Sequence, residues 1–314
     1  MKKIILDVDT GIDDAIGIMV ACASPEVELQ AVTTVSGNID LVSATRNTLR
    51  VLKIIGHENI PVYAGQKSPL KRNVRYATEI HGSTGLAGQL TEVDVENRLN
   101  EVLKSDTSAV DFMIDTINNN KGEITVIMTG PETNFARAMQ REPELENWVK
   151  EIIIMGGAAD MKGNESPVAE FNIAIDPEAA QMVFSSKAKV TMVGLDVTTK
   201  ALLTRDRIDE ITGNEAVREF VRGATHDYME RFHSKTGVYG CCMHDPLAVS
   251  LSVNPDLVGK VHKFVGVETN STYCDGMTVC DFEDRWGKEP NVHVAMEIDP
   301  KVFIDFLLER LNRL

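Results

Sequence analysis

Four carboxylates lie within eight positions near the start of the chain, at Asp7, Asp9, Asp13 and Asp14. Asp7 and Asp9 end an apolar run and are two positions apart, so on a strand both would point to one side. Because hard cations such as Ca²⁺ and Mg²⁺ take carboxylate oxygens as ligands, the spacing indicates a metal site. Asp13 or Asp14 could instead cap the helix that follows and meet its dipole favourably.

Two further motifs join acids to groups that bind sugars or donate protons. His244 precedes Asp245 and a proline, a typical helix start, and a capping carboxylate can also bind a metal. His244 itself is a candidate proton donor, a substrate contact or a buried hydrogen-bonded imidazole. Glu170 and Asn172 flank Phe171. On an extended backbone they would share one side and could hold vicinal hydroxyls, or they could satisfy their own loop.

These residues stand where strand-like runs end. Three apolar runs are each followed by a helix-like segment: Lys3–Val8 by Asp13–Ala23, Val27–Val35 by Leu41–Ile55, and Ile124–Met128 by Asn134–Gln140. Two further strands are expected at Glu151–Met155 and Lys189–Val193. Nearly continuous apolar runs suit parallel strands buried on both faces and joined by right-handed crossovers. We predict an α/β fold with a mostly parallel central sheet flanked by helices, open and Rossmann-like, with ligands beyond the carboxyl ends of the strands.

The C-terminal third is less regular. It is expected to begin with a long helix at Asn214–His233, followed by a second helix that opens at His244. Strand-like pieces near Lys260–Thr269 and Asn291–Glu297 are expected to form a hairpin or a sheet edge, and Pro300–Arg313 is expected to be the closing helix.

Charge and length limit the class of protein. The chain has 314 residues, with 47 Asp and Glu against 32 Lys and Arg, and a net charge of −15 argues against a nucleic-acid polymer as partner. No apolar stretch reaches the roughly 20 residues of a membrane span, and Asp7 and Asp9 interrupt the start before a signal-peptide core can form. Five cysteines without a Cys-x-x-Cys pair read as reduced thiols, so we expect a cytoplasmic protein. Without a linker-like tract, residues 1–314 are expected to form a single large domain.

Taken together, the motifs resemble the inosine-uridine preferring nucleoside hydrolase family along essentially the whole chain. The segments that carry the resemblance occur in the family's order: DVDTGIDDA from Asp7, TTVSGN (33–38), IHG (80–82), TGPETN (129–134), IMGG (154–157), VAEFNIAIDPEAA (168–180), VGLDVT (193–198) and HDP (244–246). One departure is Thr10, where many members have proline.

The resemblance implies Ca²⁺-dependent hydrolysis of the N-glycosidic bond of ribonucleosides to ribose and free base. It implies one Ca²⁺ per subunit, a small-molecule nucleoside as binding partner, and a homodimer or homotetramer. The implied metal ligands are Asp9, Asp14, the main-chain carbonyl of Thr129 and Asp245. Asp9 would also be the general base for a water at the cation, Asn38 would position that water and the ribose, and His244 would be the leaving-group acid or a contact to the base.

The implied substrate contacts surround this centre. The sugar contacts are Asp13, Asn164, Glu170 and Asn172, with His81 near the pocket mouth and Met155 and Phe171 as further candidates. The segment Tyr228–Met243 is expected to form a wall over the base, with His233 and Tyr239 as candidate contacts, although its glycines could equally mark an ordinary loop. Purine or pyrimidine preference stays open.

Two other classes compete with this interpretation. Asp7-Val8-Asp9-Thr10 matches the Asp-x-Asp-x-Thr signature of haloacid-dehalogenase-like Mg²⁺ phosphatases, in which Asp7 would be the nucleophile and Asp9 the acid/base. That hypothesis leaves the later motifs unexplained. A non-catalytic nucleoside-binding or metal-buffering protein would need no general base, and only an activity assay separates it from an enzyme.

Overall fold

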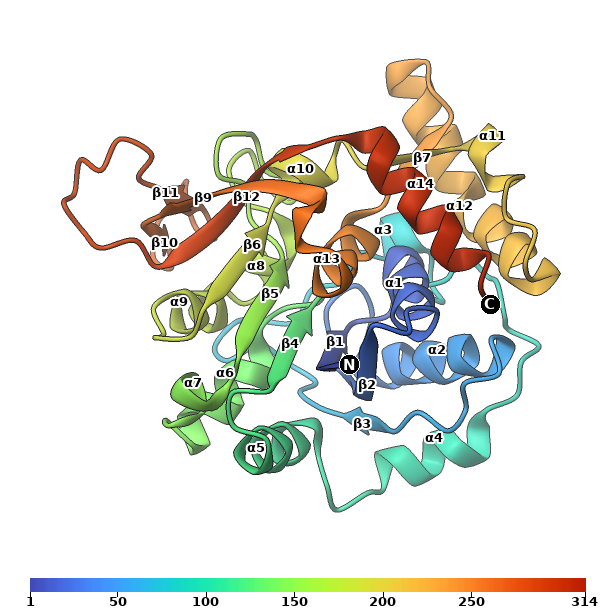
Figure 1. Ribbon diagram of the computed structural model, residues 1–314, viewed down its shortest axis with the longest axis horizontal. Coiled ribbons are helices and arrows are strands. Elements are labelled where there is room, and N and C mark those ends of the chain that lie inside the picture. The colour runs from blue at the N-terminus through green and yellow to red at the C-terminus, as the bar shows by residue number, and fades with distance from the viewer.

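Eight strands form one central sheet in the computed structural model, which describes the backbone of residues 1–314 and every side chain except that of Glu79 (Figure 1). In spatial order the strands are β3 (Val62–Ala64), β2 (Val27–Thr34), β1 (Lys2–Val8), β4 (Ile124–Met128), β5 (Glu151–Met155), β6 (Val190–Val193), β12 (Val292–Ile298) and β9 (Val258–Lys263). All neighbours are parallel except β12 and β9. Both ends of the chain contribute strands to this one sheet. Since all neighbouring pairs but one are parallel and helices alternate with the strands, the predicted α/β fold with a mostly parallel sheet is confirmed.

The strand order reverses direction beside β1. From β1 the chain builds outward through β2 to β3, and then returns to the other side of β1 to place β4, β5 and β6. Crossovers that leave in opposite directions separate at this point and open a crevice beyond the carboxyl ends of β1 and β4. The acidic segment after β1 therefore lies where such folds bind ligands.

Helices cover both faces of the sheet and each face has its own apolar core (Figure 1). The first core takes side chains mainly from α1 (Ile12–Cys22), α2 (Leu41–Ile54), α4 (Glu96–Leu103), α12 (Glu215–Thr236), α13 (His244–Val253) and α14 (Pro300–Leu311). The second takes them from α5 (Ala109–Asn119), α6 (Thr133–Arg141), α7 (Leu145–Trp148) and α9 (Pro177–Phe184). Short helices complete the chain: α3 (Thr78–His81), α8 (Phe171–Ile175), α10 (Leu195–Thr198), α11 (Arg205–Ile208) and the 3₁₀ turn η1 (Pro255–Leu257).

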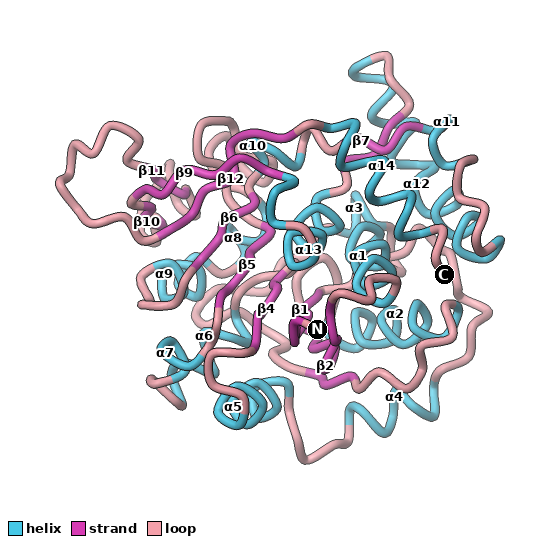
Figure 2. Tube along the Cα trace, viewed as in Figure 1, coloured by secondary structure: helices cyan, strands magenta, loops and turns pink.

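The predicted C-terminal strands need one correction. β12 and β9 form the expected antiparallel edge, but the single strand expected near Lys260–Thr269 is two strands. β9 ends at Lys263 in the main sheet, and β10 (Val265–Val267) pairs with β11 (Thr278–Cys280) in a small separate sheet, seen on the left of Figure 2. A second small sheet pairs β7 (Leu202–Thr204) with β8 (Gly240–Cys242). The segment from β9 to β10 is nearly continuous in sequence, and it is divided because its two halves pair with different strands.

Among the described residues, none of the helices is both long and apolar enough to cross a membrane.

Candidate active site and metal centre

Two helix N-termini bring three aspartates together at the carboxyl ends of β1 and β4. Asp13 and Asp14 stand in the first turn of α1, and Asp245 stands in the first turn of α13. The two helices pack closely at Gly17, where an added Cβ would lie 3.3 Å from the Val249 side chain. One oxygen from each aspartate lies within 4.8 Å of the others, so the three carboxylates could share a cation.

Asp9, a predicted metal ligand, is not one of these three acids and is held by Asn38. The Asn38 backbone N–H donates to Asp9 Oδ2 at 2.6 Å, and its side-chain amide donates to Asp9 Oδ1 at 3.1 Å and Asp14 Oδ2 at 3.2 Å. A side chain at position 37 would place Cβ 2.1 Å from Asp9 Oδ2, so Gly37 is required for this approach. The structure thus brings Asp9, Asp14 and Asn38 into one hydrogen-bonded group, and their roles at a metal or a water stay predictions.

Thr129 joins the cluster from the end of β4. Its hydroxyl donates to Asp14 Oδ1 at 2.7 Å, and its main-chain carbonyl accepts from Asn172 Nδ2 at 2.7 Å. A carbonyl oxygen has two lone pairs, so one remains for a cation beside the Asn172 amide. The position agrees with the predicted metal ligand, and the role itself stays a prediction.

Burial makes this acidic group unfavourable without a cation. Burial first, and then the neighbouring Asp14 carboxylate, raise the pKa of Asp9 well above its usual value; the same causes raise the pKa of Asp13 to about 7. Burial also raises the pKa of Asp14 and of Asp245. In the described part of the chain no Lys, Arg or His side chain forms an ion pair with any of the four. Since buried charges need a counter-charge, this all-oxygen donor set fits a hard divalent cation.

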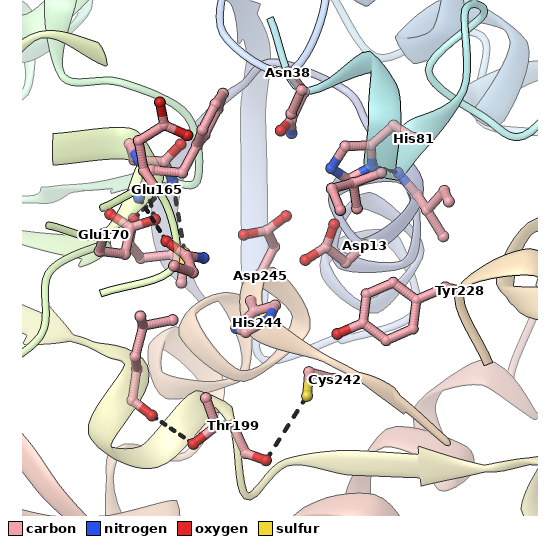
Figure 3. A pocket seen from close by; sticks show the side chains of 18 of the residues that line it. Asp13, Asn38, His81, Glu165, Glu170, Thr199, Tyr228, Cys242, His244 and Asp245 are labelled. Carbon is pink, nitrogen blue, oxygen red and sulfur yellow. Dashed lines mark hydrogen bonds between the residues drawn. The ribbon is translucent and has the colours of Figure 1, made fainter. Parts of the chain in front are cut away.

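Two of these acids, Asp13 and Asp245, line a cavity of about 850 Å³, whereas Asp9 and Asp14 are not among its described lining residues. Figure 3 shows the Asp13 and Asp245 carboxylates near its centre, with Asn38 and His81 on one side, His244 on the other and Glu170 facing them across the space. The predicted contacts Asn164, Phe171, Asn172 and Met155 also line this cavity, as do Asp13, Glu170, His81 and His244. The structure therefore gathers most of the predicted substrate contacts around one cavity.

Glu170 and Asn172 border the cavity at the start of a helix and not on an extended strand. Glu170 caps the short helix α8, and its carboxylate accepts from the backbone N–H groups of Gly157, Asn172 and Ile173 at 3.0–3.2 Å. Of the two alternatives left open by the sequence, Glu170 thus satisfies its own backbone, while contact with vicinal hydroxyls stays a prediction. Burial nonetheless raises the pKa of Glu170 to about 7, and the carboxylate borders the cavity.

Two histidines border the cavity as neutral rings. Burial lowers the pKa of His81 and that of His244 to about 4. The Ile12 backbone N–H donates to His81 Nδ1 at 3.1 Å, so the neutral ring carries its proton on Nε2. His244 Nδ1 lies 2.7 Å from the Thr198 hydroxyl, which holds that ring in place.

Part of the segment predicted as a wall over the base lines the cavity, but its two candidate contacts do not. His233 and Tyr239 stack on each other with ring centroids 3.8 Å apart and are not among the described residues that line the cavity. Tyr228 and Phe232, one helical turn apart on α12, line it instead. The missed signal is the helical phase: Val217, Val221, Ala224 and Tyr228 follow one face of the helix, and His233 lies off that face.

Asp7 does not support the phosphatase alternative. It is fully buried, its Oδ1 accepts from the Thr33 hydroxyl at 2.6 Å and from Asn134 Nδ2 at 2.8 Å, and it is not among the cavity residues. Among the described residues its hydrogen bonds go to Thr33 and Asn134, and none joins it to Asn38 or to the acids that line the cavity, so nothing in the structure places it as a nucleophile.

A further acid, Glu132, is buried behind the site without a partner. It is fully buried, and among the described residues neither carboxylate oxygen has a hydrogen-bond partner on another residue. Burial, followed by the nearby Glu170 and Asp176 carboxylates, raises the pKa of Glu132 well above its usual value. The folded protein therefore holds a proton that the unfolded chain releases near pH 4.5, so Glu132 lowers stability increasingly as pH rises from that value toward its folded-state pKa.

Replacing Glu132 by methionine should therefore stabilise the protein, by about 1–3 kcal/mol at pH 8, because an unpartnered buried acid is removed. The gain should be smaller at pH 5, because there the unfolded chain is close to the usual glutamate pKa of 4.5 and the cost of keeping the proton in the folded state is small. Urea unfolding of wild type and Glu132→Met at both pH values measures the difference, and Glu101→Met on the exposed face of α4 is the control. A variant no more stable than wild type at pH 8 would show that Glu132 has a partner in solution.

Comparisons with known proteins agree with this geometry. The profile of the family described as inosine-uridine preferring nucleoside hydrolase matches residues 4–305. The chain is 37% identical over 311 residues to a pyrimidine-specific ribonucleoside hydrolase RihA of Escherichia coli, covering 98% of each chain. It is 38% identical over 313 residues to that of Citrobacter koseri, covering 98% of this chain and 97% of the relative. Among solved structures, a plant nucleoside hydrolase superposes with a TM-score of 0.91 at 32% identity, covering 99% of both chains. A purine-preferring ribonucleoside hydrolase from Gardnerella vaginalis superposes with a TM-score of 0.88 at 33% identity, covering 99% of this chain and 98% of that one.

Proposed function

The chain belongs to the inosine-uridine preferring nucleoside hydrolase family and is a ribonucleoside hydrolase, and from this premise we propose how its cavity carries out the reaction. We propose that Asp9, Asp14, Asp245 and the Thr129 carbonyl hold one Ca²⁺ and that Asp9 is the general base. The observation that carries the proposal is the group of buried carboxylates, without a cationic side-chain partner among the described residues, of which Asp13 and Asp245 line the cavity.

At the anomeric carbon the proposed step forms a bond to the water oxygen and breaks the bond to the base nitrogen. Water attacks the anomeric carbon of the ribose as its proton passes to Asp9, and the N-glycosidic bond breaks so that the base leaves and takes up a proton. When bound, a divalent cation lowers the pKa of a coordinated water and orients the sugar. Asn38 keeps the Asp9 carboxylate facing that water through its two hydrogen bonds.

The carboxylates also favour the transition state over the ground state. As the base departs, positive charge develops on the ribose ring, and fixed negative groups around the ring stabilise that charge more than they stabilise the neutral nucleoside. Asp13, Glu170, Asn172 and Asn164 border the space where the sugar would lie, and we assign them to the ribose hydroxyls.

An assay with a panel of ribonucleosides tests the proposal. Reducing sugar and phosphate should be followed separately, with p-nitrophenyl phosphate as the second substrate. Ribose release from nucleosides is expected, without phosphate release. Phosphate release alone, or binding of nucleosides without turnover, would contradict it.

We further propose that pyrimidine ribonucleosides are the better substrates. The support is the 37% identity, over 98% of the chain, to relatives named as pyrimidine-specific. Uridine and cytidine should then give a higher kcat/KM than inosine and adenosine in the same panel. The reverse order would show that this chain follows the purine-preferring relative.

His244 is proposed to assist the departing base. As a neutral ring beside the cavity it can donate a hydrogen bond to the base as charge develops there. His244→Ala is expected to lower kcat for natural nucleosides by about 10²–10⁴-fold, the usual contribution of such a group. It should lower kcat much less for p-nitrophenyl riboside, whose leaving group needs no help. Equal losses on both substrates would argue against this role.

Two properties outside the site complete the proposal. We propose that the protein is a homodimer or homotetramer and that it acts in the cytoplasm. Light scattering after gel filtration would test the oligomeric state, and fractionation of cells would test the location.

A further inference from the structure

A segment without helix or strand, residues 65–77, leads to the rim of the cavity. It connects β3 to α3, and with α3 it supplies Tyr76, Ile80 and His81 to the cavity lining. Among the described residues of this segment only Pro69 is buried, so apolar packing does little to hold it in place. Tyr76 and Ile80 are 45% and 44% exposed, which leaves apolar surface that a bound nucleoside would cover.

Arg72 forms the most extensive tether of this segment. Its Nε donates to the Glu178 carboxylate at 2.9–3.0 Å, and its Nη1 and Nη2 donate to Asp275 at 2.9 and 3.1 Å. Nη2 also donates to the Thr269 carbonyl at 2.7 Å. The side chain is 31% exposed and that of Glu178 only 16%, so these ion pairs are partly shielded from water. Arg72 therefore ties the segment both to α9 and to the loop between β10 and β11.

Smaller tethers continue from this point toward the site. The Leu70 N–H donates to Asp176 Oδ2 at 2.8 Å, and Arg75 donates to Glu165 at 3.0 Å and to the Ala174 carbonyl at 3.1 Å. The Ala77 N–H then donates to the carbonyl of Asn38, the residue that holds Asp9. The Arg75 pair is exposed, and exposed ion pairs contribute little, which leaves Arg72 as the principal anchor.

We propose that Arg72 is a positioning residue for nucleoside binding: by holding residues 65–77 against α9 and the β10–β11 loop, it keeps Tyr76 and His81 in place at the rim. Arg72 is not itself among the cavity residues, so it acts through the segment and not by touching the substrate. This inference rests on the proposed function, because the rim residues are taken to contact the nucleoside.

The expected effect is on substrate affinity. Without its anchor the segment samples open positions, and the apparent affinity falls in proportion to the fraction of molecules whose segment is in place. If Arg72→Ala reduces that fraction to about a tenth, KM rises about tenfold while kcat of the bound complex changes much less. A purely structural defect would instead lower the amount of active protein, and thus kcat, with KM unchanged.

Steady-state kinetics of four variants with the best ribonucleoside test the proposal. Arg72→Ala should show the tenfold rise in KM, and Arg72→Lys, which keeps the charge and one donor, should recover part of it. Arg207→Ala is the matched control, since Arg207 also bridges two acids, Glu210 and Asp305, with a side chain 23% exposed, but does not border the cavity. If Arg72→Ala fails to fold, Asp275→Asn removes one partner from a loop and should raise KM in the same direction. An unchanged KM in Arg72→Ala, or an equal rise in Arg207→Ala, would overturn the proposal.

Limited trypsin digestion provides a readout that does not depend on the reaction. Cleavage after Lys71 or Arg75 should be faster in Arg72→Ala than in wild type, while cleavage outside residues 65–77 should be equal. Equal rates after Lys71 and Arg75 would show that Arg72 does not anchor the segment, even if no ribonucleoside were hydrolysed. Conversely, faster cleavage in a protein that hydrolyses no ribonucleoside would leave the anchor intact and reject the proposed function alone.

Discussion

Replacing Asp9 by asparagine is expected to lower kcat by about 10²–10⁴-fold, because the amide cannot accept a proton from the attacking water. The size and shape of the side chain are kept, and the Asn38 backbone N–H at 2.6 Å still finds an oxygen. In the absence of a cation, removing one of several buried like charges should leave the unfolding temperature unchanged or raise it. Steady-state kinetics at saturating cation, together with thermal unfolding without the cation, therefore separate a loss of chemistry from a loss of fold.

Asp7→Asn is the matched control for Asp9. Asp7 is also buried at the end of β1, but its oxygen Oδ1 is bound by Thr33 and Asn134, and Oδ2 has no hydrogen-bond partner among the described residues. Asparagine can keep the first oxygen in place, so kcat should stay within about tenfold of wild type, less than the loss typical of a general base. Retained turnover in Asp9→Asn with loss in Asp7→Asn would reverse the assignment and reject Asp9 as the base.

Removal of the divalent cation is expected to abolish turnover and to lower thermal stability. A ligand that binds only the folded protein at 100 times its dissociation constant stabilises it by about 2.7 kcal/mol. For a protein of this size that amounts to a shift of roughly 4 °C in the unfolding temperature. Chelation followed by titration with Ca²⁺, Mg²⁺ and Zn²⁺ measures both effects, and the all-oxygen site should favour Ca²⁺ over Zn²⁺.

The stabilisation should also grow with pH. Burial raises the pKa of Asp9, Asp13, Asp14 and Asp245, and that of Asp13 to about 7. The cation-free folded protein therefore binds more protons than the unfolded chain, and its stability falls as pH rises through these values. A bound cation removes this loss, so the shift in unfolding temperature should be larger at pH 8 than at pH 6.

Two variants make the cation experiment specific. Asp245→Asn should lose most of the cation-dependent shift. Asp281→Asn should retain it, because Asp281 is also buried but lies outside the cavity, and among the described residues it accepts from the Arg285 and Trp286 backbone N–H groups alone. Full turnover and an unchanged unfolding temperature after chelation would contradict the metal centre.

The regular part of the fold could be predicted because its signals are local. β4 and β5 have the predicted bounds, and α1 and α2 begin within one residue of prediction, since a buried parallel strand and an amphipathic helix each impose a pattern on neighbouring residues. The prediction near Lys260–Thr269 missed the division of that segment into β9 and β10, for the converse reason. Its division depends on two partners, β12 and β11, which no local pattern reveals.

The chemistry of the site could also be predicted in part. The acids after β1, Asn38 after β2 and Thr129 after β4 stand at strand ends, and parallel strands bring their carboxyl ends to one edge. The roles assigned to these residues remain predictions that the experiments above test.

By itself, the sequence determined the identity of the strands, the order of its motifs and the presence of acids at the strand ends, because each depends on residues close together in the chain. The tertiary structure alone decided which side chains meet. It brought Asp245 to Asp13 and Asp14 through the packing of α13 on α1 at Gly17, and turned Tyr228 toward the cavity in place of His233. The direction of a helical side chain depends on which face of the helix is buried, and partners distant in the sequence decide that face.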